Sequence, residues 1–344
     1  MRPVQSGLKV ITTRRFNSKL LITIAILILL FLIPTFVSSS YHLRITINML
    51  YMIMLVAGFR LVLSAGVFSM APQAFFGIGA YTLALLVTRL NWNWWLSALL
   101  AGVVAAVCAA IIGRILLRLK GIFFAISTLA FASVLLLIWK TFTFFGRHNG
   151  IFNISDPDPI FGFEFGSLVS YFYLALVLAV ITMFVMYRIE KSRYGFTLRC
   201  IGLNADLARS TGVNVMLYSI TAFCVGCFFA GIAGAFFASL QGSIAPTTFE
   251  FNVLMLILLY AVIGGVYSVW GPIYGVVIMT GITTGLTYIP NYDPKIGPII
   301  LGVTLIVVML RFPNGISFLL ESIPGWLKKV ISKKDKDLYV NTSS

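Results

Sequence analysis

Long apolar runs dominate this chain and limit its possible folds more than any other feature. A helix needs about 20 mostly apolar residues to cross the roughly 30 Å hydrocarbon layer of a bilayer. Ten runs of about that length occur, at residues 20–37, 45–64, 73–89, 95–117, 121–142, 168–187, 216–241, 251–270, 272–289 and 297–312. With 60% hydrophobic and 10% charged residues, the chain has too few polar side chains to cover a water-soluble globule. The sequence therefore predicts an all-α polytopic membrane protein.

Two of these runs are rich in glycine, so about 10 (8–10) segments are expected to span the membrane. The third and ninth runs are predicted to be re-entrant or broken rather than straight. A helix break is expected where the eighth run meets the ninth, at Gly264, Gly265, Gly271 and Pro272.

The basic residues predict the orientation of the spans. Most of the 25 Lys and Arg residues fall near the N-terminus, at 114–120, at 188–209 and after 310. If the N-terminus is cytoplasmic, every even-numbered span ends inside and these groups all lie there, as the positive-inside rule requires. Both termini are therefore predicted to be cytoplasmic. The net charge of +15 is explained by the attraction of basic residues to the anionic lipid of the cytoplasmic leaflet. We therefore expect no nucleic-acid partner.

The chain divides into a cytoplasmic N-terminal segment (1–19), a transmembrane domain (20–320) that holds a polar inner loop (188–215), and a cytoplasmic tail (321–344). The first run could instead be a cleaved signal peptide, although it is longer than the apolar core of most signals. The opposite, outer side is expected to carry the acidic loop residues and an interfacial belt of tryptophans, Trp92, Trp94 and Trp95.

The spans lack the groups that would drive transport or catalysis. The charged residues within the runs are all basic and lie toward run ends, at Arg60, Arg89, Arg114, Lys140 and Arg311. The proton or ion relay typical of a secondary transporter is therefore missing. The sequence also has no phosphate-binding loop, no catalytic constellation and no metal-ligand pattern, since Cys224 and Cys227 fit helix packing better than a metal site. The chain is not expected to be an enzyme, and any uphill transport would need energy from a partner. An ion-coupled secondary transporter and a non-transporting membrane scaffold remain the alternatives from other classes.

Small residues recur every four positions in the seventh run, at Gly226, Ala230, Gly234, Ala238 and Gly242. This spacing puts them on one helix face, where another helix can approach closely. Static packing and a sliding interface both fit the pattern.

Several motifs occur together in a fixed order: SMAPQAFFGIGAYTLALL at 69–86, RLKGIFFAISTLAF at 118–131, the polar block at 192–213, IGGVYSVWGPIYG at 263–275 and RFPNGI at 311–316. In this combination the chain resembles the larger permease type of branched-chain amino acid ABC importers. The resemblance covers residues 45–320. It implies a prokaryotic plasma-membrane importer with two permease chains, two cytoplasmic ATPases and an extracytoplasmic solute-binding protein. ATP and Mg would be bound by the ATPases, and this chain would need no cofactor.

The resemblance also implies a cytoplasmic helix that docks on the ATPase, at about 196–211, with Gly195 and Gly212 as its breaks and Arg199 and Arg209 free for the ATPase surface. The alternative is a simple charged turn. The expected coupling residues are Gly195, Arg199, Asn204, Ala205, Asp206, Arg209 and Gly212.

The pathway implied by the resemblance runs between two permease chains and moves solute by alternating access. Parts of the third, fifth and eighth runs would line it, and each candidate residue is equally consistent with ordinary packing. The candidates are Gln73, Phe75, Phe76, Tyr81, Thr128 and Tyr260.

The solute is expected to be a branched-chain amino acid, but the chain departs from the family's pattern at 69–72, 132–133 and Tyr267. Relatives with the same architecture import urea, short amides or nucleosides, so these remain alternatives.

Overall fold

The computed structural model describes residues 39–119, 121–159 and 165–287, together with residues 302, 303, 306, 307, 310, 311 and 317. The predicted N-terminal segment, the first span, most of the last span and the C-terminal tail lie outside the described residues. Within them, seven helices are long and apolar enough to cross a membrane, and the protein is a multi-pass membrane protein.

The elements follow the predicted runs closely. The helices are α2 (Ser40–Ser64), α3 (Pro72–Leu90), α4 (Trp94–Leu116), α5 (Ile122–Thr141), α6 (Leu168–Lys191), α7 (Arg193–Leu203), α8 (Ala205–Ser210), α9 (Val215–Gln241), α10 (Phe251–Gly264) and α11 (Gly271–Thr287). Short 3-10 turns are η1 (Thr143–Phe145), η2 (Arg147–Asn149) and η3 (Pro246–Phe249), and two short antiparallel strands are β1 (Ile151–Phe152) and β2 (Ser243–Ile244).

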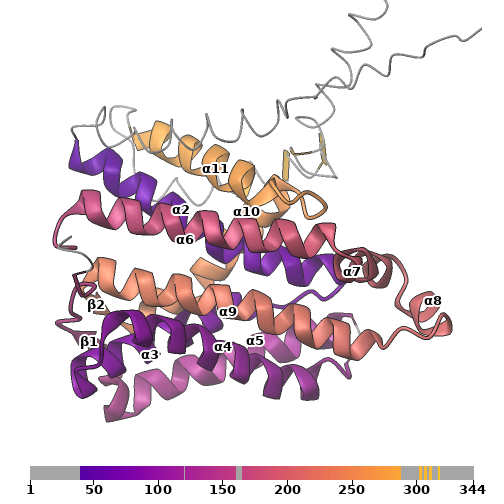
Figure 1. Ribbon diagram of the computed structural model, residues 1–344, viewed down its shortest axis with the longest axis horizontal. Helices are drawn as coiled ribbons and strands as arrows, with labels where there is room; N and C mark the ends of the chain where they lie inside the picture. The colour runs from indigo at the N-terminus through magenta and orange to yellow at the C-terminus, as the bar shows by residue number, and fades with distance from the viewer. Residues whose placement is uncertain are drawn as a thin grey trace, which may run out of the picture.

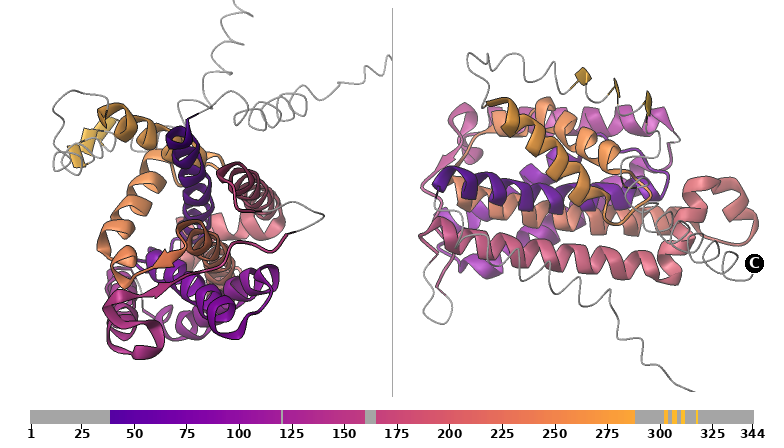
Figure 2. Two further views of the ribbon diagram at one scale, coloured as in Figure 1. Left: turned by 90° about the vertical axis from the view of Figure 1, so that its left-hand side faces the viewer. Right: turned by 90° about the horizontal axis from the view of Figure 1, so that it is seen from above.

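The long helices run side by side along one axis, and α9 lies near the centre, packed against α2, α3 and α4 (Figures 1 and 2). One end carries β1 and β2 and is called the β end. The small helices α7 and α8 project from the opposite end (Figure 1), which is called the basic end because it gathers Arg114, Arg118, Arg188, Lys191, Arg193, Arg199 and Arg209. This separation agrees with the predicted alternation of the spans.

Glycines let the central helices touch backbone to backbone. A Cβ added to Gly226 of α9 would lie 2.6 Å from the Gly58 carbonyl oxygen of α2. One added to Gly234 would lie 1.9 Å from the Phe76 carbonyl oxygen of α3. The small-residue face therefore meets two helices, as its spacing predicts. Gly242 differs from the others, because it ends α9 with a φ of 65° and a Cβ added to it would have nothing within 4 Å.

Three expectations about these segments are wrong. The third run is not broken, because α3 is one continuous helix and its glycines pack instead; a Cβ on Gly79 would lie 2.0 Å from the Gly231 carbonyl oxygen. The helix of the eighth run ends at Gly264 rather than at residue 270, because Gly265, one of the residues at which the sequence predicts a break, adopts a φ of 96°.

The third wrong expectation is that Trp94 belongs to an interfacial belt. Its side chain is buried and its Nε1 donates to Ser239 Oγ at 2.5 Å. Asp158 caps α4, since its Oδ2 accepts from Trp94 N at 2.6 Å, and Asp156 accepts from the Tyr171 hydroxyl at 2.6 Å. The loop after β1 is thus tied across the β end of α4, α6 and α9.

Candidate functional site

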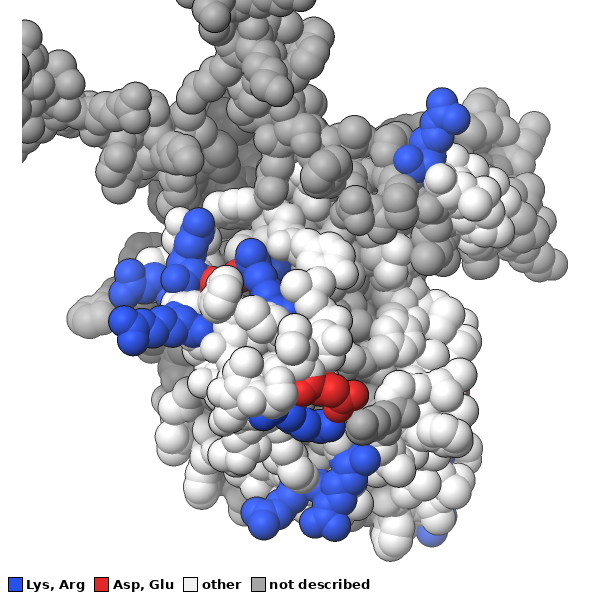
Figure 3. All heavy atoms as spheres, turned by 90° about the vertical axis from the view of Figure 1, so that its right-hand side faces the viewer, with Lys and Arg blue, Asp and Glu red and all other residues white. Residues whose placement is uncertain are grey.

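The polar block 188–215 lies at the basic end of the bundle, where α7 packs on the helix ends and α8 extends beyond them. It folds into α7 and α8 and projects beyond the ends of α6 and α9 (Figure 2). The charged side chains on this face are mostly basic (Figure 3). The block is therefore structured, and it is more than a charged turn.

The expected single helix over 196–211 is wrong, because Asn204 divides it in two. Asn204 Oδ1 accepts from the backbone N–H groups of Asp206 at 3.1 Å and Leu207 at 3.0 Å. This is an N-cap, the position that asparagine favours, so Asn204 ends α7 and begins α8. Ala205 and Asp206 then form the first turn of α8 rather than the middle of a longer helix.

The two flanking glycines have different roles. Gly212 follows α8 with a φ of 85°, a left-handed conformation that suits glycine after a helix. Gly195 is not a break, since it is buried in the first turn of α7. A Cβ there would lie 2.4 Å from the Ile189 carbonyl oxygen, so glycine is needed for α7 to fold back against the end of α6.

Three large apolar side chains on this element are unusually exposed. Phe196 is 69% exposed, Leu203 78% and Leu207 65%. They stand on a polar element at the basic end and not along the apolar bundle, so lipid does not account for them as it does for the exposed side chains of α4 and α5. Exposed apolar groups within a polar surface are typical of a protein-binding site.

The two arginines expected to be free are both paired, so that expectation is wrong. Arg209 Nη1 lies 2.9 Å from Asp206 Oδ1, and both side chains are exposed. Arg199 forms a short ion pair with Glu190 Oε1 at the end of α6.

Glu190 also forms a buried ion pair that the sequence did not reveal. Its Oε2 lies 2.6 Å from Arg60 Nη2 on α2, and the side chains are 6% and 1% exposed. Arg60 Nη1 donates to the Val266 carbonyl oxygen at 3.2 Å, in the turn between α10 and α11. The signal available in the sequence was an arginine inside an apolar run, which requires an acidic partner.

Further contacts fix α7 to the bundle. Gly202 packs on the end of α2, where its added Cβ would lie 2.5 Å from the Ser64 carbonyl oxygen. The Tyr194 hydroxyl donates to the Tyr218 carbonyl oxygen of α9 at 3.0 Å. Burial raises the pKa of Tyr194, so this donor stays protonated.

The candidate pathway residues lie in the bundle interior. Phe75, Phe76 and Tyr81 of α3 are buried, as are Thr128 of α5 and Tyr260 of α10. Tyr81 stacks on Trp139 with ring centroids 4.8 Å apart and borders Phe76 through Phe249. The structure therefore brings Phe76 and Tyr81 into one aromatic cluster, while Phe75, Thr128 and Tyr260 lie in other contacts.

Two of these side chains tie the start of α3 to its surroundings. Thr128 Oγ1 accepts from Met70 N at 2.9 Å, and Gln73 Nε2 donates to the Met70 carbonyl oxygen at 3.3 Å. Gln73 Oε1 and the Tyr81 hydroxyl are buried without a partner among the described residues.

Replacing Tyr81 by phenylalanine is expected to leave the free energy of unfolding unchanged or to raise it by about 1 kcal/mol, because no hydrogen bond is lost. Denaturant titration of the purified chain in micelles measures this change. A clear loss of stability would mean that the hydroxyl is bonded in the resting protein.

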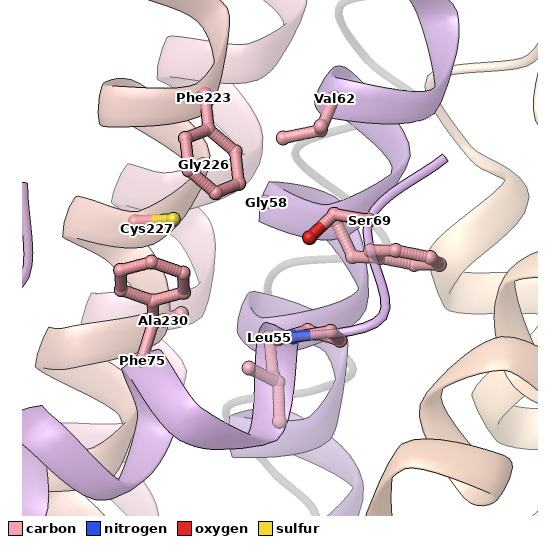
Figure 4. Close-up of a pocket in the computed structure, with 11 residues that line it drawn as sticks. Leu55, Gly58, Val62, Ser69, Phe75, Phe223, Gly226, Cys227 and Ala230 are labelled. Carbon is pink, nitrogen blue, oxygen red and sulfur yellow. The ribbon is translucent and has the colours of Figure 1, made fainter. Parts of the chain in front are cut away.

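A cavity of about 20 Å³ lies where α2, α3 and α9 cross (Figure 4). Phe75, Phe223 and Cys227 line one side of it and Ser69 the other, near the contact of Gly58 with Gly226. It has room for one water molecule and not for an amino acid. At the β end, an open depression of about 260 Å³ is lined by Asn149, Phe152, Phe237, Gln241, Ser243, Ile244, Ala245 and Thr248.

The predicted break residues form the turn that receives Arg60. α10 ends at Gly264, Gly265 caps it, and α11 begins with Gly271 and Pro272. A Cβ on Gly264 would lie 2.0 Å from the Gly271 carbonyl oxygen, so these glycines allow the two helices to meet closely.

Comparison with known proteins gives one consistent result. A family model described as "Branched-chain amino acid transport system / permease component" matches residues 41–309. The chain is 28% identical over 351 residues to the high-affinity branched-chain amino acid transport system permease protein LivM of Escherichia coli (strain K12), covering 92% of this chain and 81% of the relative. It is 29% identical over 321 residues to the LivM protein of Salmonella typhimurium, covering 86% and 74%. No solved structure matches.

Proposed function

We propose that this chain, which belongs to the family of branched-chain amino acid transport permeases, forms the solute path of an ABC importer. Separate cytoplasmic subunits hydrolyse the ATP. The protein is a multi-pass protein of the prokaryotic plasma membrane. As a transport subunit, it works by alternating access together with a second permease chain and an extracytoplasmic binding protein. The partner ATPases, and not this chain, bind ATP and Mg.

The observation that carries this proposal is the projecting element α7–α8. An ATPase that drives a membrane bundle needs a surface outside the bilayer to bind. Phe196, Leu203 and Leu207 offer that surface at the basic end, where the positive-inside rule puts the cytoplasm. Burying one such side chain contributes about 1.5–3 kcal/mol to binding.

The relatives' names support a branched-chain amino acid as the solute. The described interior is apolar and aromatic around Tyr81 and Trp139, which would suit the aliphatic side chain of such a solute, while its ammonium and carboxylate groups would need polar partners. Urea, short amides and nucleosides are the alternatives within the same architecture, and an ion-coupled transporter is the alternative from another class.

Reconstitution tests the proposal. The chain is placed in vesicles with its candidate sister permease, ATPases and binding protein, and uptake of leucine, urea and a nucleoside is measured. We expect ATP-dependent leucine uptake that stops with a hydrolysis-deficient ATPase. Uptake that continues with that ATPase and stops with an ionophore would instead establish the ion-coupled transporter.

The docking surface gives a direct prediction. Replacing Leu207 by serine is expected to weaken ATPase association about tenfold, because an apolar contact is lost from the interface. Pull-down from solubilised membranes with titrated ATPase measures this affinity. The matched control is Phe152→Ser, which removes a side chain that is 63% exposed at the opposite end and should leave association unchanged. If the ATPase bound both variants equally tightly, α8 would not be part of the interface.

A further inference from the structure

One carboxylate connects the projecting element to the membrane spans. Glu190 accepts from Arg199 of α7 with one oxygen and from Arg60 of α2 with the other. Arg60 in turn reaches the turn between α10 and α11 through the Val266 carbonyl oxygen. Glu190 therefore lies on a continuous polar route from α7 through α6 and α2 to the helix pair α10–α11.

The two bonds to Glu190 differ in how easily they open. Arg60 is 1% exposed and Glu190 6%, so separating them would leave charges buried without a partner, which is costly. Arg199 is 48% exposed, so its guanidinium is rehydrated when it leaves. The Arg60–Glu190 pair is thus the fixed joint, and the Arg199–Glu190 pair is the one that can open and close.

Apart from the apolar packing of its buried side chains Leu198 and Ile201, the other contacts of α7 with the spans are few and do not replace this bond. Gly202 touches α2 through a close backbone contact. This contact prevents the two helices from coming closer, but it does not hold them together when they are drawn apart. Tyr194 joins α7 to α9 at its other end. A displacement that draws α7 away from the bundle therefore reaches α2 and the α10–α11 turn through Arg199 and Glu190.

We infer that Arg199 is a positioning residue that transmits movement of α7 to the spans through Glu190, and that it is not part of the surface that binds the ATPase. This inference rests on the proposed function, because the movement is supplied by the ATPases. It assigns different tasks to neighbouring parts of the α7–α8 element. The exposed apolar side chains bind the ATPase, and the Arg199–Glu190 ion pair transmits its movement to the spans.

The test uses the reconstituted transporter and compares three variants of the full chain. Arg199→Gln removes the pair and leaves Arg60–Glu190 intact. Arg199→Lys keeps a charge that can reach Glu190. Arg193→Gln is the matched control, since it removes the same charge from an exposed position of the same helix. ATPase association, ATP hydrolysis and leucine uptake are measured for each.

For Arg199→Gln we expect association within twofold of the unaltered protein and ATP hydrolysis retained, while uptake per ATP falls about tenfold through loss of a charge-assisted bond. Arg199→Lys should recover most of that ratio, and Arg193→Gln should keep it. An unchanged ratio in Arg199→Gln overturns the inference. Weakened association overturns it too, because Arg199 would then bind the ATPase, and so does failure of the variant to insert, because the pair would be only structural. Absence of ATP-dependent uptake in the unaltered protein is a separate result that contradicts the proposed function itself.

Discussion

Replacement of Glu190 by glutamine is expected to lower the free energy of unfolding of the bundle by about 3–5 kcal/mol, because it leaves the charge of a buried arginine unpaired. Arg60 is 1% exposed and sits on a span, so neither water nor lipid headgroups can solvate its guanidinium fully. Its remaining hydrogen bond is to the Val266 carbonyl oxygen at 3.2 Å. That oxygen is a neutral acceptor and does not compensate the positive charge. Denaturant titration in micelles, followed by tryptophan fluorescence, measures the change.

Glu250→Gln is the matched control for this experiment. It breaks the ion pair with Lys140 at the β end, whose side chains are 26% and 38% exposed. Because water screens that pair, its loss should cost less than about 1 kcal/mol. The double variant Arg60→Met with Glu190→Gln should recover much of the lost stability, since no buried charge remains. Equal destabilisation by Glu190→Gln and Glu250→Gln would show that the Arg60–Glu190 pair is open to water.

The long helices could be predicted from sequence because the bilayer fixes their length. An apolar run that must cross a hydrocarbon layer begins and ends where polar residues return, and α4 and α9 match their predicted runs to within a residue. α10 does not, because Gly265 ends it inside an uninterrupted apolar run. Hydropathy carries no information about a positive φ, and the sequence signal for this break is the pair of glycines Gly264 and Gly265.

The site was less predictable because its key contacts are not local. Arg60 and Glu190 are 130 positions apart, and no periodicity joins an arginine in one run to a glutamate at the end of another. Asn204 was a local signal that could have been used, since asparagine followed by an acidic residue is typical of a helix start. A single helix over 196–211 would place Asn204 in a helix interior, where it cannot act as an N-cap. The roles of the pathway and docking residues stay predictions until transport is measured.

The glycine crossing of α3 and α9 gives the second large effect. Gly234→Ala is expected to destabilise the bundle by about 1–3 kcal/mol, as overpacking of a core does. The added Cβ would lie 1.9 Å from the Phe76 carbonyl oxygen and 2.9 Å from Ala80 N, and backbone atoms cannot move aside as a flexible side chain can. The two helices must separate, which weakens the contacts of Phe76 with Phe237 and Phe249.

Gly281→Ala in α11 is the control for the crossing, because its added Cβ has nothing within 4 Å and alanine favours a helix over glycine. Its stability should be unchanged or slightly higher.

The two variants, Gly234→Ala and Gly281→Ala, also distinguish the two interpretations of the small-residue face. Loss of stability with uptake per ATP preserved would identify the α3–α9 contact as static packing. A fall in uptake per ATP that exceeds the loss of folded protein would mean that these helices move against each other during transport, since an interface held apart by a methyl group can no longer reach both of its packed positions. If Gly234→Ala and Gly281→Ala unfolded at the same denaturant concentration, the close backbone contact between α3 and α9 would itself be contradicted.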